Sequence, residues 1–225
     1  MKINYNFFYF LCMWASFCLG KTHENFRKPN SNRMEKAVKM ILGSKTLIIS
    51  RAVFAREDYA TCVVSRLKSV STSGYQHNLS YYEKEIKMPT QLGKRVYLDA
   101  HYAVHQKNNV VVFVVHAYAG NRLEDSKLSG SYKALYANKG CFIVGTDSPG
   151  YTSNVASNTV NTPKANAACL VWRLLKANEE DRARCRAAFA KVCGKYGRYK
   201  FVFTRDVCLM KQSLNQTLLG TKQMN

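Results

Sequence analysis

The stretch KRVYLDAHYAV (residues 94–104) alternates between polar and apolar side chains. Because successive side chains of a β-strand point to opposite faces, one face of this stretch holds Arg95, Tyr97, Asp99 and His101. The other face holds Val96, Leu98, Ala100 and Tyr102. The pattern predicts a strand with one face in water and the other on a core.

Similar stretches, rich in β-branched and aromatic residues, lie on both sides of this strand and are separated by turn residues. Their spacing of about 8–12 residues is typical of β-barrels and sandwiches. Eight strands are predicted, over residues 44–54, 61–70, 79–87, 94–104, 109–118, 131–137, 141–147 and 167–174. Eight strands are enough to close a barrel, so we expect an all-β fold with an eight-stranded antiparallel barrel.

Two helices are expected beside the strands. Residues 178–193 begin with a favourable N-cap, Asn178, and three acidic residues follow where the helix dipole favours anions. The apolar stripe by which this C-terminal helix should pack on the barrel consists of Cys185, Phe189 and Val192. A short helix over residues 33–42, within an N-terminal segment 21–43, is expected to plug one end of the barrel and is predicted by the spacing of Met34, Val38 and Ile41.

The first 20 residues have the features of a secretory leader. Lys2 precedes an apolar run over residues 7–19, and the small residues Cys18 and Gly20 suit the −3 and −1 positions of a signal-peptidase site. The run is too short to cross about 30 Å of hydrocarbon as a stable helix. We therefore expect a signal peptide at residues 1–20 and a secreted, extracellular protein. The barrel and its helix should occupy residues 44–208, and residues 209–225 should form a flexible tail.

The charge is strongly positive, with 34 basic and 14 acidic residues, and removal of the leader with its single lysine leaves a net charge of +19. A surface of this sign attracts polyanions such as glycosaminoglycans and steers anionic ligands. It is also typical of an ordinary soluble, basic secreted protein. No long basic run and no RNP, zinc-finger or basic-helix pattern occurs, so nucleic acid is not an expected partner.

Six cysteines remain after removal of the leader: Cys62, Cys141, Cys169, Cys185, Cys193 and Cys208. An even number in an oxidising compartment predicts three disulfides, although six cysteines can pair in many ways. The sequons at Asn78 and Asn215 predict two glycosylation sites on the surface.

Residues that carry catalytic or metal chemistry do not form a recognisable pattern. His101 and His105 would lie about 13 Å apart on a strand, at about 3.3 Å per residue, so they cannot share one metal ion. His77 and His116 have no metal-site motif around them. Gly-x-Ser-x-Gly and phosphate-loop motifs do not occur. We therefore expect a binding protein without metal, cofactor or enzymatic activity.

A more specific pattern occupies the C-terminal third of the chain. Its segments are YKALYANKGCFIV (residues 132–144), CLVW (169–172), CRAAFAKVCG (185–194) and YKFVFTRDVC (199–208), and LIISRAVFAREDYATCVVSRL (47–67) precedes them. The order and spacing, over residues 34–208, resemble those of the salivary lipocalins of ticks, the tick histamine-binding protein family. The resemblance implies a lipocalin-type barrel with an attached C-terminal helix. We expect the protein to be a monomer. It also implies the disulfides Cys62–Cys193, Cys141–Cys169 and Cys185–Cys208, the first two of which would each contribute about 2–4 kcal/mol.

The resemblance further implies capture of a small ligand. Family members that bind histamine or serotonin carry acidic residues where this chain has Phe142 and Leu170. A cationic amine needs carboxylates in a desolvated pocket, so these apolar positions argue against an amine. Other carboxylates that could replace them are Glu57, Asp58, Glu83, Glu85 and Asp99.

An anionic lipid, such as an eicosanoid or fatty acid, suits an apolar barrel with positive charge near its mouth. Arg51 or Arg95 could bind its carboxylate. The candidate pocket residues are Arg51, Tyr82, Arg95, Leu98, Asp99, Tyr102, Phe113, Tyr136 and Trp172.

The leading hypothesis is a secreted lipocalin that sequesters a small host mediator, either a bioactive lipid or a biogenic amine, to evade host defence. The alternative is an interaction protein whose basic surface binds a host protein of haemostasis or complement, or a heparin-like polyanion. A hollow, aromatic-lined barrel would favour the first hypothesis, and a filled barrel with a large basic face would favour the second.

Overall fold

The computed structural model describes residues 30–84, 92–120, 123–146 and 168–209. The predicted signal peptide, the sequon at Asn215, Glu85 and nearly all of the predicted tail lie outside these residues.

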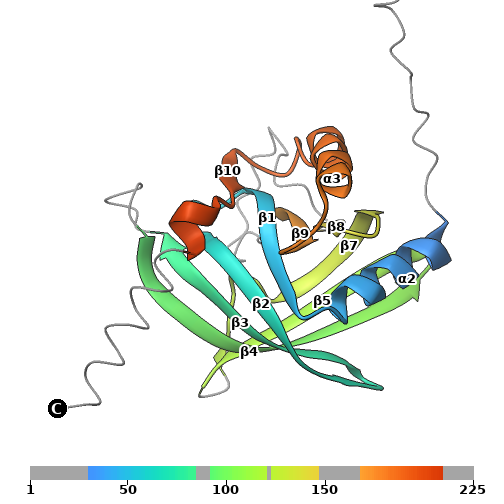
Figure 1. Cartoon of the computed structure of the whole chain (residues 1–225). Helices are drawn as coiled ribbons and strands as arrows, with labels where there is room; N and C mark the ends of the chain where they lie inside the picture. The colour runs from blue at the N-terminus through green and yellow to red at the C-terminus, as the bar shows by residue number, and fades with distance from the viewer. Residues whose placement is uncertain (1–29, 85–91, 121–122, 147–167, 210–225) are drawn as a thin grey trace, which may run out of the picture.

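Eight strands form a closed antiparallel ring (Figure 1). They are β1 (Thr46–Phe54), β2 (Ala60–Ser71), β3 (Gly74–Lys84), β4 (Leu92–Lys107), β5 (Val110–Ala119), β7 (Gly130–Ala137), β8 (Cys141–Gly145) and β9 (Ala168–Leu174). Neighbours in this order pair with one another, and β9 pairs with β1 to close the ring. The predicted eight-stranded antiparallel barrel is confirmed.

The alternation of residues 94–104 is confirmed in β4. Tyr97 is 68% exposed, whereas its neighbour Leu98 is 5% exposed and belongs to the main core. Ala100 and Tyr102 follow Leu98 on the buried face, and Asp99, between Leu98 and Ala100, is exposed. The period of two residues therefore decides which side chains fill the barrel.

Two short strands were not predicted: β6 (Leu123–Glu124), which pairs with β5, and β10 (Tyr199–Val202). Strand β1 pairs with β2 only over Thr46–Ile48. From Arg51 to Phe54, β10 takes the place of β2 beside β1. The C-terminal segment thereby fills the gap that opens where β1 and β2 diverge.

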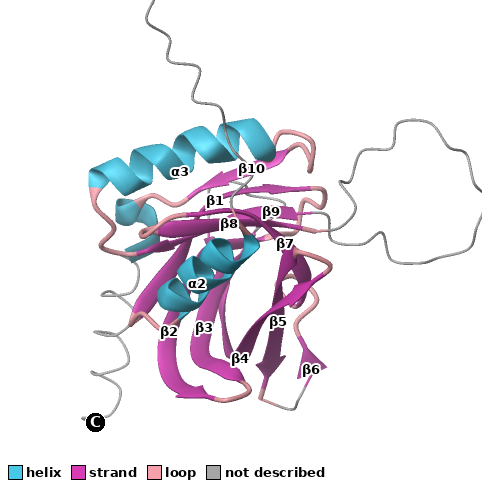
Figure 2. Ribbon diagram, turned by 90° about the vertical axis from the view of Figure 1, so that its right-hand side faces the viewer, coloured by secondary structure: helices cyan, strands magenta, loops and turns pink. Residues whose placement is uncertain are grey.

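The short N-terminal helix, α2 (Ser31–Leu42), is confirmed at one end of the ring, where Figure 2 shows it in front of the strands. It buries four side chains, Met34, Val38, Ile41 and Leu42, in the main core. We call the opposite end, where β1 ends and β2 begins, the mouth. Of the helices in the described ranges, none is both long and apolar enough to span a bilayer.

The C-terminal helix, α3 (Glu179–Val192), lies on the outside of the barrel (Figure 2). The predicted N-cap is confirmed, because the side chain of Asn178 accepts a hydrogen bond of 2.8 Å from the backbone N–H of Asp181. Cys185 and Ala188 are its buried residues, and they pack in a second core cluster on the outer faces of β8 and β9.

The six cysteines form three disulfides as expected, but all three predicted pairings are wrong. The observed pairs are Cys62–Cys208, Cys141–Cys185 and Cys169–Cys193. Cys141 and Cys169 lie on neighbouring strands, but Cys141 is opposite Arg173 and Cys169 is opposite Gly145. A separation of four strand residues is about 13 Å, which a disulfide cannot bridge. Two bridges instead fasten α3 to β8 and β9, and the third fastens the segment after β10 to β2.

Candidate ligand site

A cluster of aromatic rings fills the barrel interior. Trp172 on β9 lies 5.8 Å from Tyr102 on β4, 6.1 Å from Phe113 on β5 and 6.4 Å from Phe142 on β8, measured between ring centroids. All four side chains are at most 1% exposed. Inward-facing positions of four different strands thus meet in one apolar cluster near the barrel axis.

Three polar side chains continue this cluster towards α2. Nε2 of His77 lies 3.0 Å from the carbonyl oxygen of Leu42, so this nitrogen must carry the proton and donate. Nδ1 then accepts from the hydroxyl of Ser65 at 3.0 Å, and the hydroxyl of Tyr102 donates to Ser65 at 2.8 Å. Burial lowers the pKa of His77 to about 4 and raises the pKa of Tyr102 above its ordinary value. The chain of hydrogen bonds is neutral and satisfies each of its members.

The indole N–H of Trp172 is different. It is buried, and no hydrogen-bond partner lies within reach of it in the described part of the chain. A buried donor without a partner is uncommon in proteins and needs a specific explanation. An acceptor atom of a bound molecule would supply the missing partner.

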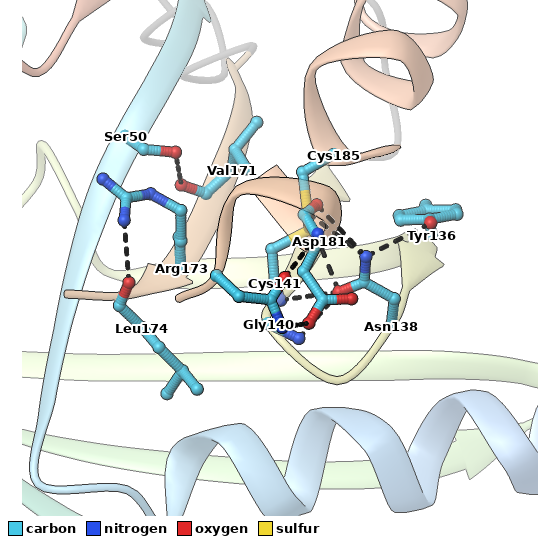
Figure 3. The surroundings of a disulfide bond; sticks show 11 residues. Ser50, Tyr136, Asn138, Gly140, Cys141, Val171, Arg173, Leu174, Asp181 and Cys185 are labelled. Atoms are coloured by element: carbon cyan, nitrogen blue, oxygen red, sulfur yellow. Dashed lines mark hydrogen bonds between the residues drawn. A yellow bond between two sulfur atoms is a disulfide. The ribbon is translucent and has the colours of Figure 1, made fainter. Parts of the chain in front are cut away.

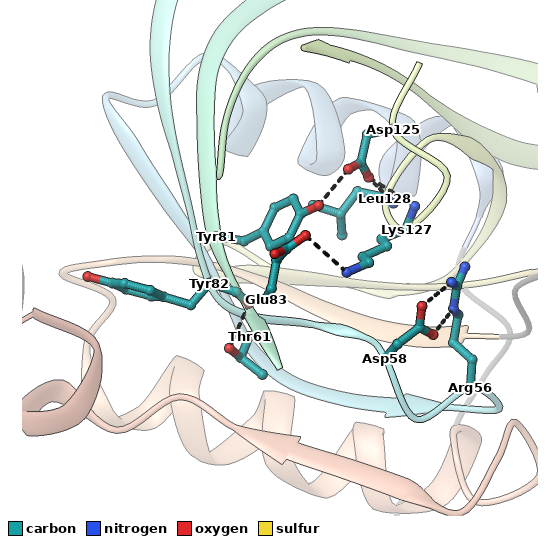
Figure 4. Close-up of polar contacts among 9 residues, drawn as sticks. All are labelled: Arg56, Asp58, Thr61, Tyr81, Tyr82, Glu83, Asp125, Lys127 and Leu128. Carbon is teal, nitrogen blue, oxygen red and sulfur yellow. Dashed lines mark hydrogen bonds and ion pairs between the residues drawn. The ribbon is translucent and has the colours of Figure 1, made fainter. Parts of the chain in front are cut away.

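The mouth carries a cluster of charged side chains around Tyr81 (Figure 4). The hydroxyl of Tyr81 donates to Asp125 at 2.6 Å, and burial together with this bond raises the pKa of Tyr81. The other oxygen of Asp125 accepts from the backbone N–H groups of Lys127 and Leu128, both at 2.9 Å. These bonds hold the loop between β6 and β7 over the mouth, and they bury the side chain of Leu128 in the core.

Two ion pairs complete the mouth. Lys127 lies 3.7 Å from Glu83, and Arg56 binds Asp58 and lowers the pKa of that carboxyl group through their hydrogen bond. The mouth cluster (Arg56, Asp58, Tyr81, Glu83, Asp125, Lys127) therefore holds three carboxylates and two cations. Positive and negative side chains therefore both lie where the polar end of a ligand would reach the mouth.

The nine predicted pocket residues do not line one cavity. Leu98, Tyr102, Phe113 and Trp172 lie inside the barrel, in the main core. The other five, Arg51, Tyr82, Arg95, Asp99 and Tyr136, lie on the outer faces of the strands, where Tyr82 is buried under other side chains. Arg95 donates to Ser80 at 2.9 Å and to Tyr82 at 3.3 Å across the outside of β3 and β4. The expected contact of Arg51 or Arg95 with a ligand inside the barrel is therefore wrong.

Several site residues were missed by the sequence reasoning. In the sequence, Phe142 stands out only as a departure from the family pattern. Its alternation with Cys141 and Ile143 would have placed it on the opposite face of β8 from these two residues. Asp125 and Leu128 lie in the loop that follows β6, and nothing in the local pattern points to the barrel mouth.

The remaining predictions concern the sequon at Asn78, metal binding and the position of Tyr136. Asn78 is exposed on β3, as a glycosylation site requires, and its modification stays a prediction. The described residues contain no group of three or more His, Cys, Asp or Glu side chains that could hold a metal ion. A cleft of about 870 Å³, lined by residues of α2, the β7–β8 turn and the start of α3, includes Tyr136 and lies outside the barrel.

A closed ring of eight antiparallel strands connected up and down is the barrel of the lipocalin type. No family model and no curated protein matches the chain. The solved structures that resemble it include japanin from Rhipicephalus appendiculatus bound to cholesterol. That structure aligns with 14% sequence identity and a TM-score of 0.44, over 69% of this chain and 91% of that chain. The lipocalin-type fold rests on the strand pairing and not on this likeness.

Proposed function

We propose that the protein is a secreted lipocalin that sequesters a small host mediator inside its barrel, without catalysis, to evade host defence. The observation that carries the proposal is the buried indole N–H of Trp172, which has no partner among the described residues and lies within the aromatic cluster. Because the described interior is packed with side chains, a ligand with an apolar body and an acceptor oxygen would have to displace some of them to reach the rings and accept this hydrogen bond. The three disulfides support secretion, because they are typical of oxidising compartments.

The ligand class stays between a bioactive lipid and a biogenic amine. Arg51 and Arg95 lie outside the barrel, so an anionic head group would instead bind Arg56 and Lys127 at the mouth. Asp58, Glu83 and Asp125 lie beside them and could receive a cation instead. The acceptor for Trp172 does not separate the two classes, because the oxygens of a lipid, the imidazole of histamine and the hydroxyl of serotonin can all accept a hydrogen bond.

Native mass spectrometry of the protein secreted from eukaryotic cells would test the proposal. The panel contains arachidonate, a leukotriene, a thromboxane analogue, cholesterol, histamine and serotonin. We expect stoichiometric capture of one class, and we expect Trp172→Phe to weaken it roughly two- to tenfold because the variant keeps a ring and loses one hydrogen bond. Tyr97→Phe changes an exposed ring outside the barrel and serves as the control. Failure to capture any member of the panel would overturn the proposal.

The second candidate function is the interaction of the basic surface with a host protein or a heparin-like polyanion. Two observations favour it: the described interior is packed with side chains, and arginine side chains gather in clefts outside the barrel. The two functions use different parts of the molecule and do not exclude each other.

A further inference from the structure

Two adjoining clefts on the outside of the barrel are lined by cations. The first, of about 90 Å³, includes Arg51 of β1 and Arg186 of α3. The second, of about 300 Å³, includes Lys176 and Arg205. Arg173 of β9 and Arg182 of α3 line both clefts. We call the six residues together the arginine cleft (Arg51, Arg173, Lys176, Arg182, Arg186, Arg205).

Arg173 lies half-buried at the junction of the two clefts, and Figure 3 shows its guanidinium group beside β1, below Ser50. Its Nη1 atom donates to the carbonyl oxygens of Leu174 and Leu175, at 2.9 and 3.3 Å. In the described part of the chain no carboxylate lies within ion-pair distance of it. Burial first, and then the positive charge of Arg182, lower the pKa of Arg173 to about 10.

Among the described residues, the carboxylate of Glu179 forms ion pairs with cations of the arginine cleft. It lies 3.1 Å from Arg182 and 2.7 Å from Arg186, so it is shared by two cations that already hold it. Neither cleft has an acidic residue in its lining. The arginine cleft therefore has a large excess of positive charge around the half-buried Arg173, and an anion bound there would be attracted by these cations.

The chain holds these cations in fixed positions. Disulfides from Cys185, in the middle of α3, and from Cys193, at its end, fasten the helix to β8 and β9. Arg182 and Arg186 lie on either side of Cys185 along the helix. On β1, the bulge at Ser50 turns both Ser50 and Arg51 outward, and the Ser50 hydroxyl donates to the carbonyl oxygen of Val171. A site that is held rigid before binding loses little entropy when a ligand arrives.

The shape and chemistry of the arginine cleft point to a ligand with several oxoanion groups in a row. Guanidinium groups bind sulfate and phosphate through paired hydrogen bonds, and the cations extend over two clefts instead of surrounding one point. We propose that the arginine cleft binds the sulfate groups of an extracellular sulfated polysaccharide, with Arg173 at its centre. This inference rests on the second candidate function and not on capture inside the barrel.

Heparin binding by the secreted full chain would test the site. Affinity is measured by calorimetry with a defined heparin oligosaccharide, at about 0.15 M salt so that distant surface charges are largely screened. We expect Arg173→Gln to weaken binding roughly tenfold, since it removes charge-assisted hydrogen bonds. Arg173 also donates to two backbone carbonyl groups, so its replacement could disturb the fold. A second variant, Arg51→Gln/Arg205→Gln, removes two charges from the cleft and leaves these hydrogen bonds intact. It should weaken heparin binding by a similar factor.

The matched control is Lys94→Gln/Lys107→Gln, which removes two positive charges from β4, on the opposite side of the ring. We expect this control to change the affinity less than about twofold. An equal loss of heparin affinity in the control would show that binding depends on net charge, and the assignment of binding to the arginine cleft would be wrong. Absence of heparin binding by the unmodified protein would also overturn it.

Two further probes decide the class of ligand. Duplex DNA and vesicles containing phosphatidylserine are titrated under the same conditions. If either binds as tightly as heparin with the same dependence on Arg173, the assignment to a polysaccharide is wrong. Capture of the mediator panel is measured in the same variants and should not change, so failure of this site and failure of the barrel proposal can be told apart.

Discussion

His77 is held in its neutral form by its two hydrogen-bond partners. Nε2 donates to the carbonyl group of Leu42, and Nδ1 must stay unprotonated to accept from Ser65. A second proton on the ring would oppose the Ser65 hydroxyl and would place a charge where the side chain is 1% exposed. The residue thus links the end of α2 to the barrel interior only while it is uncharged.

The pH dependence of stability should report this link. The pKa of His77 is about 4 in the folded protein and near 6.5 in the unfolded chain, so between these values the unfolded chain binds a proton that the folded protein does not. Stability contributed by His77 is complete above pH 6.5 and is lost as the pH falls towards 4, by up to about 3 kcal/mol. We expect His77→Gln, whose amide can keep both hydrogen bonds, to flatten the dependence of the unfolding free energy on pH in denaturant titrations.

His101→Gln is the control for this experiment, because His101 lies on the outer face of β4. Its pH profile should follow that of the unmodified protein. A His77→Gln protein with an unchanged slope between pH 4 and 6.5 would show that other groups cause the dependence.

Arg51 shows why the face of a residue could not be predicted from alternation alone. Leu47 and Ile49 face the core of the barrel, but the register shifts at Ser50, and Ala52 and Phe54 face the core after it. A shift by one residue moves a side chain to the opposite face of the strand. The stretch TLIISRAVF (Thr46–Phe54) contains no glycine or proline that would have signalled the bulge.

At the scale of elements, β10 and the segment after it close the side of the barrel. The strand pairs with β1 where β2 has moved away, and the segment brings Cys208 to Cys62 with a Cα–Cα distance of 5.2 Å. Tyr82 packs against this disulfide on the outer face of β3. Strand β10 has only four residues, so its alternation of half-buried and exposed side chains is too short to predict a strand from the sequence.

Removal of the Cys62–Cys208 bridge should loosen β10 selectively. We expect Cys62→Ser/Cys208→Ser to lower the unfolding free energy by about 2–4 kcal/mol, because the bridge closes a long loop in the unfolded chain. Hydrogen exchange should increase in β10 and in Arg51–Phe54 of β1, which lose their ordered partner, and should change little in α3. Cys169→Ser/Cys193→Ser is the matched comparison and should loosen the end of α3 instead. Equal loosening of both elements in both proteins would contradict the separate roles of the bridges.

At the scale of the whole molecule, the barrel could be predicted because its ring is made of local patterns. Each strand carries its own alternation, and strands that follow one another in the sequence are neighbours in the ring. The mouth cluster could not be predicted, because Asp58 and Asp125 come from two separate loops, Tyr81 comes from β3, and the three meet only after the ring has closed. The disulfide pairing could not be predicted for a similar reason, since it depends on where α3 and β10 dock on the finished barrel.

The chain closes both ends of its own barrel, with α2 at one end and Leu128 at the mouth. If a ligand enters through the mouth, Leu128 must move aside. We therefore expect Leu128→Ala to speed the association of N-phenyl-1-naphthylamine, a neutral fluorescent probe, measured by stopped flow through energy transfer from Trp172. Leu42→Ala removes an equally buried leucine at the α2 end and keeps the carbonyl group that His77 binds. Both variants should lose about 2–5 kcal/mol of stability, so a faster association in Leu128→Ala alone reports the route of entry and not general loosening. Equal acceleration in both variants, or a larger effect of Leu42→Ala, would show that the mouth is not the entrance.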